Sequence, residues 1–388
     1  MDPKYEPPQT LTRSKCSACY KQYKKNEHLI EHMIVSYHSV HDPACTVCKK
    51  HCKTLESVRE HLSGPLAKAD CMKVFVERGC ILCLCIFDSP DVLKVHEQNC
   101  RLSPAPPIGF GGTTLLEKST QSEMEITSLS GESCCNQGLQ VVAMDCEMVA
   151  VGSVGSDACA RVCLIDEDEN VLFHSYVKPE LPVKDYRYEI TGITEAHFQD
   201  GLSLKRVRAK IKEILYDAES WKARRILVGH SLDNDLLCLR LTYPEHLKRD
   251  TAIYPPLMKT NLVSHSLKDL TRTYLGYEIQ TGTHDPFEDC VAVMRLYKRM
   301  RGQVHQNEDF SPSSGIPHSI NGFVINGFDA YDTNDLMKMS PDALLQISRP
   351  KYMCWCLDSK QASDTDLDSS SSVASLDKIL DGFSLSGE

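Results

Sequence analysis

The chain has 388 residues, 41% of them hydrophobic, and a formal net charge of −10, which suits a globular protein with one good-sized domain and accessory units. No apolar run is long enough to span a bilayer, and the polar, proline-rich start does not resemble a secretory signal. We therefore expect neither a membrane protein nor a secreted one. The 19 cysteines then indicate metal binding in a reducing compartment rather than disulfides.

Three units near the start of the chain repeat the spacing Cys-x2-Cys-x12-His. A hairpin that carries two thiolates opposite a helical histidine can close a tetrahedral Zn²⁺ site, and units this small need the metal to fold. The expected ligands are Cys16, Cys19, His32 and His38 in residues 13–42; Cys45, Cys48, His61 and Cys71 in residues 43–72; and Cys80, Cys83, His96 and Cys100 in residues 78–101. The pattern predicts two to three structural zinc ions.

Some alternatives remain within these units. The last spacing of the second unit is long, so its fourth ligand, Cys71, is the least well supported. Three further histidines are spare candidates: His28, His41 and His51. Of these, His41 is an alternative to His38. Cys52 and Cys85 are more typical of packed thiols than of ligands.

The sequence leaves two kinds of binding partner open for the zinc units: nucleic acid and protein. Residues 1–100 carry 14 Lys and Arg against 12 Asp and Glu, and several lysines gather near the first two units: Lys21, Lys24, Lys25, Lys49, Lys50 and Lys53. Such lysines suit contacts with phosphates. The connections between units lack the short linker of arrays that follow the DNA major groove. We favour structured or double-stranded RNA, with protein docking as the alternative.

Residues 102–138 and 303–388 lack the pattern of a folded domain. The first stretch is rich in proline, glycine and serine and is expected to be a linker. The second is acidic and rich in Ser and Asp, and we expect it to be largely disordered. Trp355, with Cys354 and Cys356, marks one short apolar exception. An acidic tail is also a candidate surface for protein partners.

Residues 139–302 have the pattern of a compact α/β domain. Apolar and β-branched runs predict strands at 140–144, 161–165, 171–177 and 226–228, with a turn at 166–170 that joins the second to the third. Helical spacing predicts helices at 204–216, 266–275 and 287–297, and a further helix that carries Asp235. This order predicts a mixed sheet with helices on both faces, and we expect the first strand to end at Asp145.

Four acids and one histidine form the candidate catalytic set: Asp145, Glu147, Asp235, Asp289 and His284. Asp145 and Glu147 are two residues apart, so on a strand both carboxylates point to the same face. Each residue alone is typical of a solvated strand end, a first helical turn or a loop. Together, at the ends of apolar elements, they match a two-metal phosphodiesterase, in which carboxylates hold two divalent cations and a histidine takes the proton of the attacking water.

These residues resemble the DEDDh exonucleases of the ribonuclease H-like fold, in particular the branch of RNA exonuclease 4 and the apoptosis-enhancing nuclease. The strings that carry the resemblance are Val-Ala-Met-Asp-Cys-Glu-Met-Val (142–149), Asp-Tyr-Arg (185–187), Thr-Gly-Ile (191–193), Leu-Val-Gly-His (227–230), Asn-Asp-Leu (234–236), Arg-Asp-Thr (249–251), Ser-Leu-Lys-Asp-Leu (266–270) and Glu-Asp-Cys-Val-Ala-Val-Met-Arg-Leu-Tyr (288–297). Pro286 and Phe287, beside His284, depart from the usual pattern and are expected to stiffen its loop.

The resemblance implies a role for each residue. Asp145 would bridge both ions, Glu147 and Asp289 would complete the tighter site, Asp235 would hold the second ion partly through water, and His284 would deprotonate the attacking water. Mg²⁺ or Mn²⁺ suits this ligand set better than Zn²⁺. Three residues within the matching strings are candidates for substrate contact: Met148, His230 and Asn234. Packing is the alternative role of Met148.

We therefore expect a metal-dependent 3′→5′ exonuclease that acts on RNA in preference to DNA and releases nucleoside 5′-monophosphates, with zinc units that assist substrate binding. A DNA exonuclease is the nearest alternative, because none of the five residues reads the 2′-hydroxyl group. A zinc-finger adaptor that binds nucleic acid without cleaving it is the alternative from another class. The resemblance and the zinc units suggest a nuclear or nucleolar location, with the cytoplasm as the alternative.

Overall fold

The computed structural model describes residues 14–36, 38–106, 140–217, 219–303, 328, 331–348 and 353–359. Most of the expected linker at 102–138, and most of the expected tail at 303–388, lie outside these residues. None of the described helices is long and apolar enough to cross a membrane.

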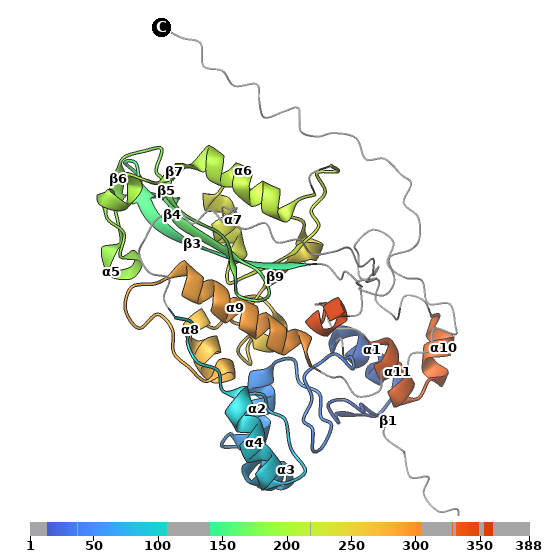
Figure 1. The fold of residues 1–388 in the computed structure, drawn as a ribbon. Helices are drawn as coiled ribbons and strands as arrows, with labels where there is room; N and C mark the ends of the chain where they lie inside the picture. Colours follow the sequence, from blue (N-terminus) through green and yellow to red (C-terminus); the bar gives the residue numbers. More distant parts are fainter. Residues whose placement is uncertain are drawn as a thin grey trace, which may run out of the picture.

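A seven-stranded sheet forms the centre of the α/β domain (Figure 1). Its strands are β3 (Val141–Val151), β4 (Ser156–Ile165), β5 (Val171–Lys178), β6 (Val183–Asp185), β7 (Leu202–Ser203), β8 (Ile226–Gly229) and β9 (Lys248–Asp250). The order is β7-β5-β4-β3-β8-β9, and β6 pairs with the far end of β3. Because β3 runs antiparallel to β4 and parallel to β8, the sheet is mixed, as predicted.

Helices cover both faces of the sheet (Figure 1). They are α5 (Tyr188–Thr191), α6 (Leu204–Leu215), α7 (Leu232–Cys238), α8 (Leu267–Leu270) and α9 (Pro286–Arg301), with short turns η1 (Glu195–Phe198), η2 (Glu245–Leu247) and η3 (Pro255–Leu257) between them. Alternation along β3 separates two cores. Val141 and Ala143 pack with α8 and α9, whereas Val142 and Met144 pack with α6 and α7. The predicted fold class is confirmed.

Strand β3 is longer than the sequence pattern indicated. We expected it to end at Asp145, but it continues to Val151, with a bulge between Glu147 and Met148. The second half persists because it pairs with β4 and, at Ala150 and Val151, also with β6. Asp145 and Glu147 therefore lie in the middle of a strand and not at its end.

The segment predicted as one helix at 266–275 is divided in two. Ser266 caps α8 by accepting a hydrogen bond from the Asp269 amide at 3.1 Å. After Leu270 the helix widens into a π-helical turn, η4 (Thr271–Leu275). Gly276 ends it with a φ of 85°, a left-handed conformation that favours glycine.

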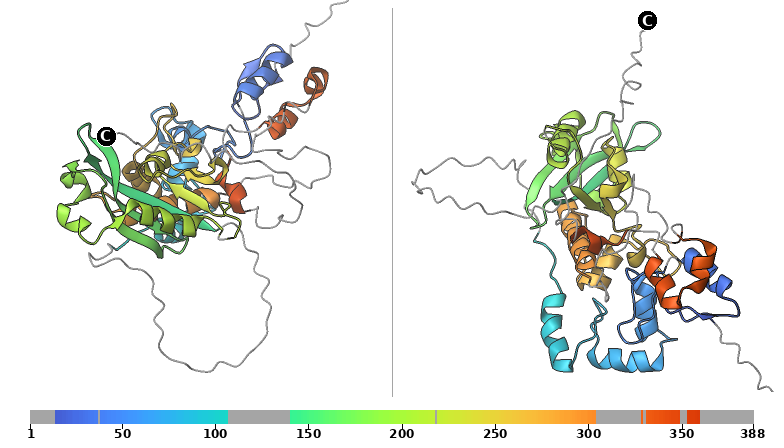
Figure 2. Two further views of the ribbon diagram at one scale, coloured as in Figure 1. Left: turned by 90° about the horizontal axis from the view of Figure 1, so that it is seen from above. Right: turned by 90° about the vertical axis from the view of Figure 1, so that its right-hand side faces the viewer.

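The predicted zinc units, which are called zinc units below, lie on the side of the sheet that α8 and α9 cover (Figures 1 and 2). They contain β1 (Ser14–Lys15), β2 (Gln22–Tyr23), α1 (Asn26–Ser36), α2 (Leu55–Ser63), α3 (Ala69–Arg78) and α4 (Pro90–Cys100). Leu55, Val58 and Phe75 belong to the same apolar core as Tyr254 and Leu257 of the α/β domain. The second unit is therefore packed onto this domain. Its last helix continues to Arg78, six residues past the predicted boundary.

Described segments of the C-terminal stretch are helical. Helices α10 (Thr333–Lys338) and α11 (Pro341–Ile347) contribute Leu336 and Leu344 to a core that they share with α1. The turn η6 (Trp355–Ser359) packs against α9, and the Trp355 ring stacks on Tyr254 with centroids 3.8 Å apart. We expected 303–388 to be largely disordered, with a short apolar exception at Cys354, Trp355 and Cys356, and gave no helices at 333–338 or 341–347. In these segments, however, the apolar side chains have partners elsewhere in the fold.

Candidate functional site

Asp145 and Glu147 project from the middle of β3 toward α9, on the same face of the sheet as Ala143. Glu147 is buried and Asp145 is half-buried. Cys146, between them, points to the opposite face, where it packs in the core with α6 and α7. Because side chains alternate along β3, the two carboxylates lie on the same face of the sheet.

Asp289 reaches the same face from the first turn of α9. Asp285 caps this helix by accepting a hydrogen bond from the Phe287 amide at 2.9 Å, and Pro286 occupies the position where no amide donor is needed. One carboxylate oxygen of Asp289, Oδ2, accepts a hydrogen bond from Gln280 Nε2 at 2.9 Å. The other, Oδ1, is buried and has no hydrogen-bond partner among the described residues. A buried oxygen without a donor is costly, and a cation would satisfy it.

Asp235 is held by a short turn between β8 and α7. The Asp250 carboxylate accepts hydrogen bonds from the amides of Ser231 at 2.8 Å and Leu232 at 2.9 Å, which fixes the start of α7. A side chain at Gly229 would lie 2.3 Å from Leu232 and 3.1 Å from the Met144 carbonyl, so the turn requires glycine. Asp235 is buried, and Cys146 beside it partly opposes the rise of its pKa that burial causes.

Burial raises the pKa of all four carboxyl groups, and neighbouring carboxylates of the set add to the shift at Asp145 and Glu147. Burial and the neighbouring Asp289, Asp235 and Glu147 raise the pKa of Asp145 well above its usual value. Burial, and then Asp289, raise the pKa of Glu147 to about 8, although the Arg161 guanidinium opposes this shift. Burial raises the pKa of Asp289 to about 7, and burial also raises that of Asp235. Such a concentration of oxygen donors fits divalent cations such as Mg²⁺ or Mn²⁺.

His284 lies in the loop that leads into α9 and is half-buried. Its amide donates a hydrogen bond to the Ile190 carbonyl at 2.6 Å, and buried Pro286 and Phe287 hold the following residues. His284 is therefore tied to Ile190 by its backbone and directly precedes the capped start of α9. Burial and the nearby Lys268 lower the pKa of His284, which favours the neutral imidazole that a general base needs.

The three candidates for substrate contact have different surroundings. The His230 ring is within 2.9 Å of the Thr251 hydroxyl, and burial lowers its pKa. Asn234 is exposed on α7. Met148 is half-buried and packs against the core with α6 and α7, which is the arrangement that its packing role predicts.

Sequence reasoning missed two residues that surround the carboxylates. Arg161 on β4 is buried, contacts Asp285 at 3.2 Å and donates to His174 at 2.8 Å. Gln280 supplies the donor to Asp289. An arginine within the apolar run Cys-Ala-Arg-Val-Cys-Leu was a usable signal, because a buried arginine needs an acidic partner. Gln280, in a loop, gave no comparable signal.

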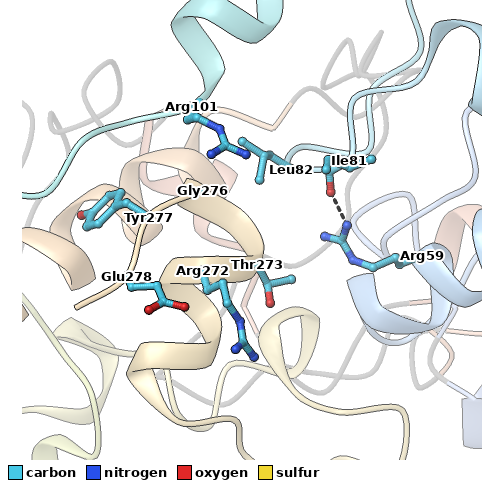
Figure 3. A pocket seen from close by; sticks show the side chains of 9 residues that line it. All are labelled: Arg59, Ile81, Leu82, Arg101, Arg272, Thr273, Gly276, Tyr277 and Glu278. Carbon is cyan, nitrogen blue, oxygen red and sulfur yellow. Dashed lines mark hydrogen bonds between the residues drawn. The ribbon is translucent and has the colours of Figure 1, made fainter. Parts of the chain in front are cut away.

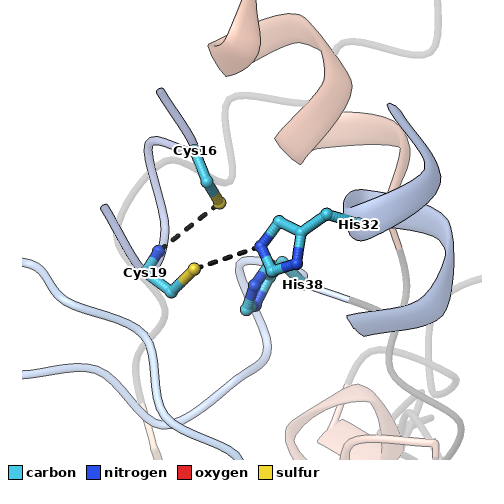
Figure 4. A group of neighbouring side chains, drawn as sticks. All are labelled: Cys16, Cys19, His32 and His38. Atoms are coloured by element: carbon cyan, nitrogen blue, oxygen red, sulfur yellow. Dashed lines mark hydrogen bonds between the residues drawn. The ribbon is translucent and has the colours of Figure 1, made fainter. Parts of the chain in front are cut away.

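Each predicted zinc unit has its four donors close together. In all three units the donor atoms lie within 4.8 Å of one another, with Cys71 in the second set and His38, rather than His41, in the first (Figure 4). The distances from thiol sulfur to imidazole Nε2 are 3.1 Å for Cys19 and His32, 3.3 Å for Cys48 and His61, and 3.3 Å for Cys83 and His96. Two thiols and two imidazoles, or three thiols and one imidazole, are donor sets that fit Zn²⁺.

The surroundings of these donors differ in detail. In the first unit the Ser36 hydroxyl lies 3.0 Å from His32 Nδ1, and the Asp42 carboxylate lies 3.6 Å from His38 Nδ1. Both contacts orient the rings through the nitrogen opposite the donor. Cys52 is half-buried against the apolar core, as predicted, whereas Cys85 is exposed and is not a packed thiol.

A separate pocket of about 420 Å³ lies between the zinc units and η4 (Figure 3). Three arginines line it, each from a different element: Arg59, Arg101 and Arg272. Two nitrogens of Arg59, Nε and Nη2, are buried without a hydrogen-bond partner among the described residues, although the guanidinium lies over the Tyr274 ring. None of the four carboxylates lines this pocket, so it is distinct from the candidate metal centre.

Comparisons with known proteins agree with this arrangement. The family model described as "Exonuclease" matches residues 142–297. RNA exonuclease 4 of Aspergillus fumigatus is 36% identical over 191 residues, which is 48% of this chain and 59% of the relative. RNA exonuclease 4 of Candida glabrata is 36% identical over 185 residues, which is 47% of this chain and 68% of the relative. The chain therefore matches more than half of the length of the first relative and about two thirds of the length of the second.

Among solved structures, the Pan2 pseudoubiquitin hydrolase–RNA exonuclease module of Saccharomyces cerevisiae, in complex with A7 RNA, is 25% identical, with a TM-score of 0.37. That match covers 44% of this chain and 30% of the Pan2 chain. The assignment depends on the family model and on the curated relatives. The chain belongs to the exonuclease family that includes the RNA exonuclease 4 proteins.

Proposed function

We propose that this protein is a 3′→5′ exonuclease that hydrolyses RNA to nucleoside 5′-monophosphates in a reaction that requires Mg²⁺ or Mn²⁺. The convergence of four carboxylates, from β3, α7 and α9, carries this proposal. Membership of the exonuclease family and the names of its RNA exonuclease 4 relatives support it. A purely structural cluster of four buried or half-buried acids would have no evident benefit, because burial makes their ionisation costly.

Asp145, Glu147, Asp235 and Asp289 are the residues that would hold the cations. When bound, two such ions stabilise the attacking and leaving oxygens of an in-line phosphoryl displacement. His284 accepts the proton of the attacking water on its neutral imidazole. Arg161 positions the loop by binding Asp285, the cap of the helix that carries Asp289. Asp250 has the equivalent role for Asp235, since it fixes the first turn of α7.

The zinc units, as we propose, bind Zn²⁺ and hold the RNA that extends away from the catalytic site. The arginines that line the pocket between these units and η4 support this role, because guanidinium groups pair well with phosphates (Figure 3). Met148, His230 and Asn234 are proposed to contact the nucleotide at the 3′ end. We propose a nuclear location, and an accessory role in protein binding for the zinc units and the acidic tail.

Degradation of a 5′-labelled single-stranded RNA tests the catalytic proposal. The wild-type chain with Mg²⁺ or Mn²⁺ should produce a ladder that shortens from the 3′ end. Asp145→Ala should abolish it and His284→Ala should slow it strongly, while both variants retain RNA binding. A DNA oligomer of the same sequence serves as the matched substrate. Faster cleavage of the DNA would identify DNA rather than RNA as the preferred substrate. Binding without cleavage of either oligomer would support an adaptor function.

A further inference from the structure

A further group of candidate metal-binding side chains shares no residue with the three predicted zinc ligand sets. His41, Cys354 and Cys356 place their donor atoms within 4.8 Å of one another. The His41 Nδ1 atom is 3.2 Å from the Cys356 sulfur, and the two sulfurs are 3.0 Å apart. Both cysteines are buried and neither forms a disulfide. The histidine and the Cys356 thiol are 315 residues apart in the sequence, so only the fold brings them together.

The geometry of this group resembles that of the other units. Its distance from sulfur to imidazole nitrogen, 3.2 Å, falls between the 3.1 Å and 3.3 Å of the same pair in the three predicted zinc units. Two thiolates and one imidazole are soft to intermediate donors, which favour Zn²⁺ over Mg²⁺ or Ca²⁺. Three protein donors leave the fourth tetrahedral position to water or to an additional side chain.

The two cysteines are held in place by contacts that do not depend on a metal. Between them, Trp355 stacks on Tyr254 at an interplanar angle of 9°, and its amide donates to the Tyr254 hydroxyl at 3.3 Å. Asp358 forms a buried ion pair with Arg249, with a shortest distance of 2.6 Å, and accepts a hydrogen bond from the Tyr297 hydroxyl at 2.9 Å. The α/β domain therefore fixes the backbone that presents both sulfurs.

His41 is also fixed, from the side of the zinc units. It lies in a turn in which the Asp42 amide donates to the Ser39 carbonyl at 3.0 Å and the Ser39 amide donates to the Asp42 carboxylate at 3.1 Å. The His41 amide is 3.3 Å from the Ser39 hydroxyl. This turn follows His38, the last predicted ligand of the first unit, and precedes Cys45, the first predicted ligand of the second. A site with donors fixed on both sides requires little reorganisation to bind a metal.

We propose that His41, Cys354 and Cys356 bind one additional Zn²⁺, which joins the C-terminal segment 353–359 to the turn at residues 39–42, between the last ligand of the first zinc unit and the first ligand of the second. This ion would link the zinc units to the C-terminal segment 353–359, which itself packs on the α/β domain. The site is independent of catalysis, because none of its donors belongs to the carboxylate set, and it adds to the three zinc ions proposed above.

Native mass spectrometry of the full-length protein, purified without added chelator, tests the site. The double variant Cys354→Ser/Cys356→Ser should contain one zinc ion fewer than the wild-type chain, whatever the total. The matched control is Cys85→Ser, because Cys85 is exposed and belongs to none of the proposed ligand sets. It should keep the wild-type count. An equal zinc count in the wild-type chain and the double variant would overturn the proposal.

Two further measurements test the site even if the double variant Cys354→Ser/Cys356→Ser fails to fold. His41→Asn changes a half-buried loop side chain and should also lose one ion. The wild-type chain exchanged with ¹¹³Cd²⁺ should show an NMR resonance, additional to those of the zinc units, at a shift typical of two sulfur ligands. Absence of this resonance overturns the proposal, as does a disulfide between Cys354 and Cys356 in the native chain. Exonuclease activity is measured in parallel, so that failure of this site is distinguished from failure of the catalytic proposal.

Discussion

The zinc units and the carboxylate centre assemble their donors in opposite ways. In each zinc unit all four donors lie within a short, continuous segment, such as Cys16 to His38. The carboxylates come from three separate elements, from Asp145 on β3 to Asp289 on α9. A zinc unit has too little core to hold its donors without the metal, whereas the sheet and its helices hold the carboxylates in place. Loss of metal should therefore unfold the first kind of site and leave the second intact.

The largest expected effect is the loss of catalysis without loss of fold. Asp145→Asn removes a charged ligand but keeps its shape, and we expect the exonuclease rate to fall by at least about 10³-fold because cation binding fails. Circular dichroism and thermal unfolding should stay close to wild type. Asp233→Asn is the control. Asp233 lies on α7 near Asp235, but its side chain is 81% exposed and outside the proposed ligand set, so the variant should retain activity. Unfolding of Asp145→Asn would contradict the contrast with the zinc units.

Replacement of the proposed base should have the next largest effect. We expect His284→Ala to lower kcat by about 10²- to 10³-fold, since general base catalysis contributes on this scale. The acidic limb of the rate against pH should also disappear, because the lowered pKa of His284 places its protonation in that limb. His246→Ala alters an exposed histidine and serves as the control. An unchanged pH profile would assign the base to another group.

Disruption of a zinc unit should affect substrate binding more than chemistry. Cys80→Ser/Cys83→Ser removes two proposed ligands of the third unit, which should unfold locally and lose one zinc ion. We expect KM for RNA to rise by about 10-fold, because phosphate contacts are lost, while kcat changes little. Steady-state kinetics and zinc content measure both effects. A large fall in kcat at unchanged KM would show that this unit supports the catalytic fold instead.

The carboxylate centre should destabilise the protein when its cations are absent. In the unfolded chain Glu147 ionises near its ordinary pKa of 4.5, but in the folded chain it stays protonated until about pH 8. Between these values the unfolded state releases a proton that the folded state retains, so stability falls as pH rises. Without added Mg²⁺, Glu147→Gln should therefore raise Tm at pH 8 by about 5 °C.

The same variant should change Tm far less at pH 4.5, where the carboxyl group is protonated in the folded chain and still half protonated in the unfolded chain, so little of the free-energy difference has developed. Thermal unfolding with and without Mg²⁺ at the two pH values measures this difference. Added Mg²⁺ should stabilise the wild-type chain and have little effect on Glu147→Gln. A lower Tm of the variant at pH 8 would mean that Glu147 has a stabilising partner in the folded chain.

The smallest expected effect concerns the arginine-lined pocket. Arg101→Glu reverses one charge there, and we expect KM for RNA to rise by about threefold at low salt and by less at high salt, because phosphate contacts are screened. Arg206→Glu, on α6 away from this pocket, is the matched charge reversal. Equal effects of both variants would indicate a general influence of net charge rather than a specific RNA path.

The sequence by itself determined the features that depend on local spacing. Alternation identified the sheet and placed Asp145 and Glu147 on one face, and the repeated Cys-x2-Cys-x12-His interval selected three donor sets that lie together in the structure. A strand or a small zinc unit is specified mainly by its own residues, so its pattern is visible before folding. The same local pattern predicted an end of β3 that is too early in the chain, because pairing with β4 and β6 extends the strand.

Only the tertiary structure decided which distant residues meet. Arg161 and Gln280 surround the carboxylates because β4 and the loop before α9 fold onto the same face. His41 was only a spare ligand in the sequence, yet the docking of residues 353–359 on the α/β domain brings two cysteines to it. No periodicity links residues separated by hundreds of positions, since their proximity depends on the packing of whole elements rather than on local spacing.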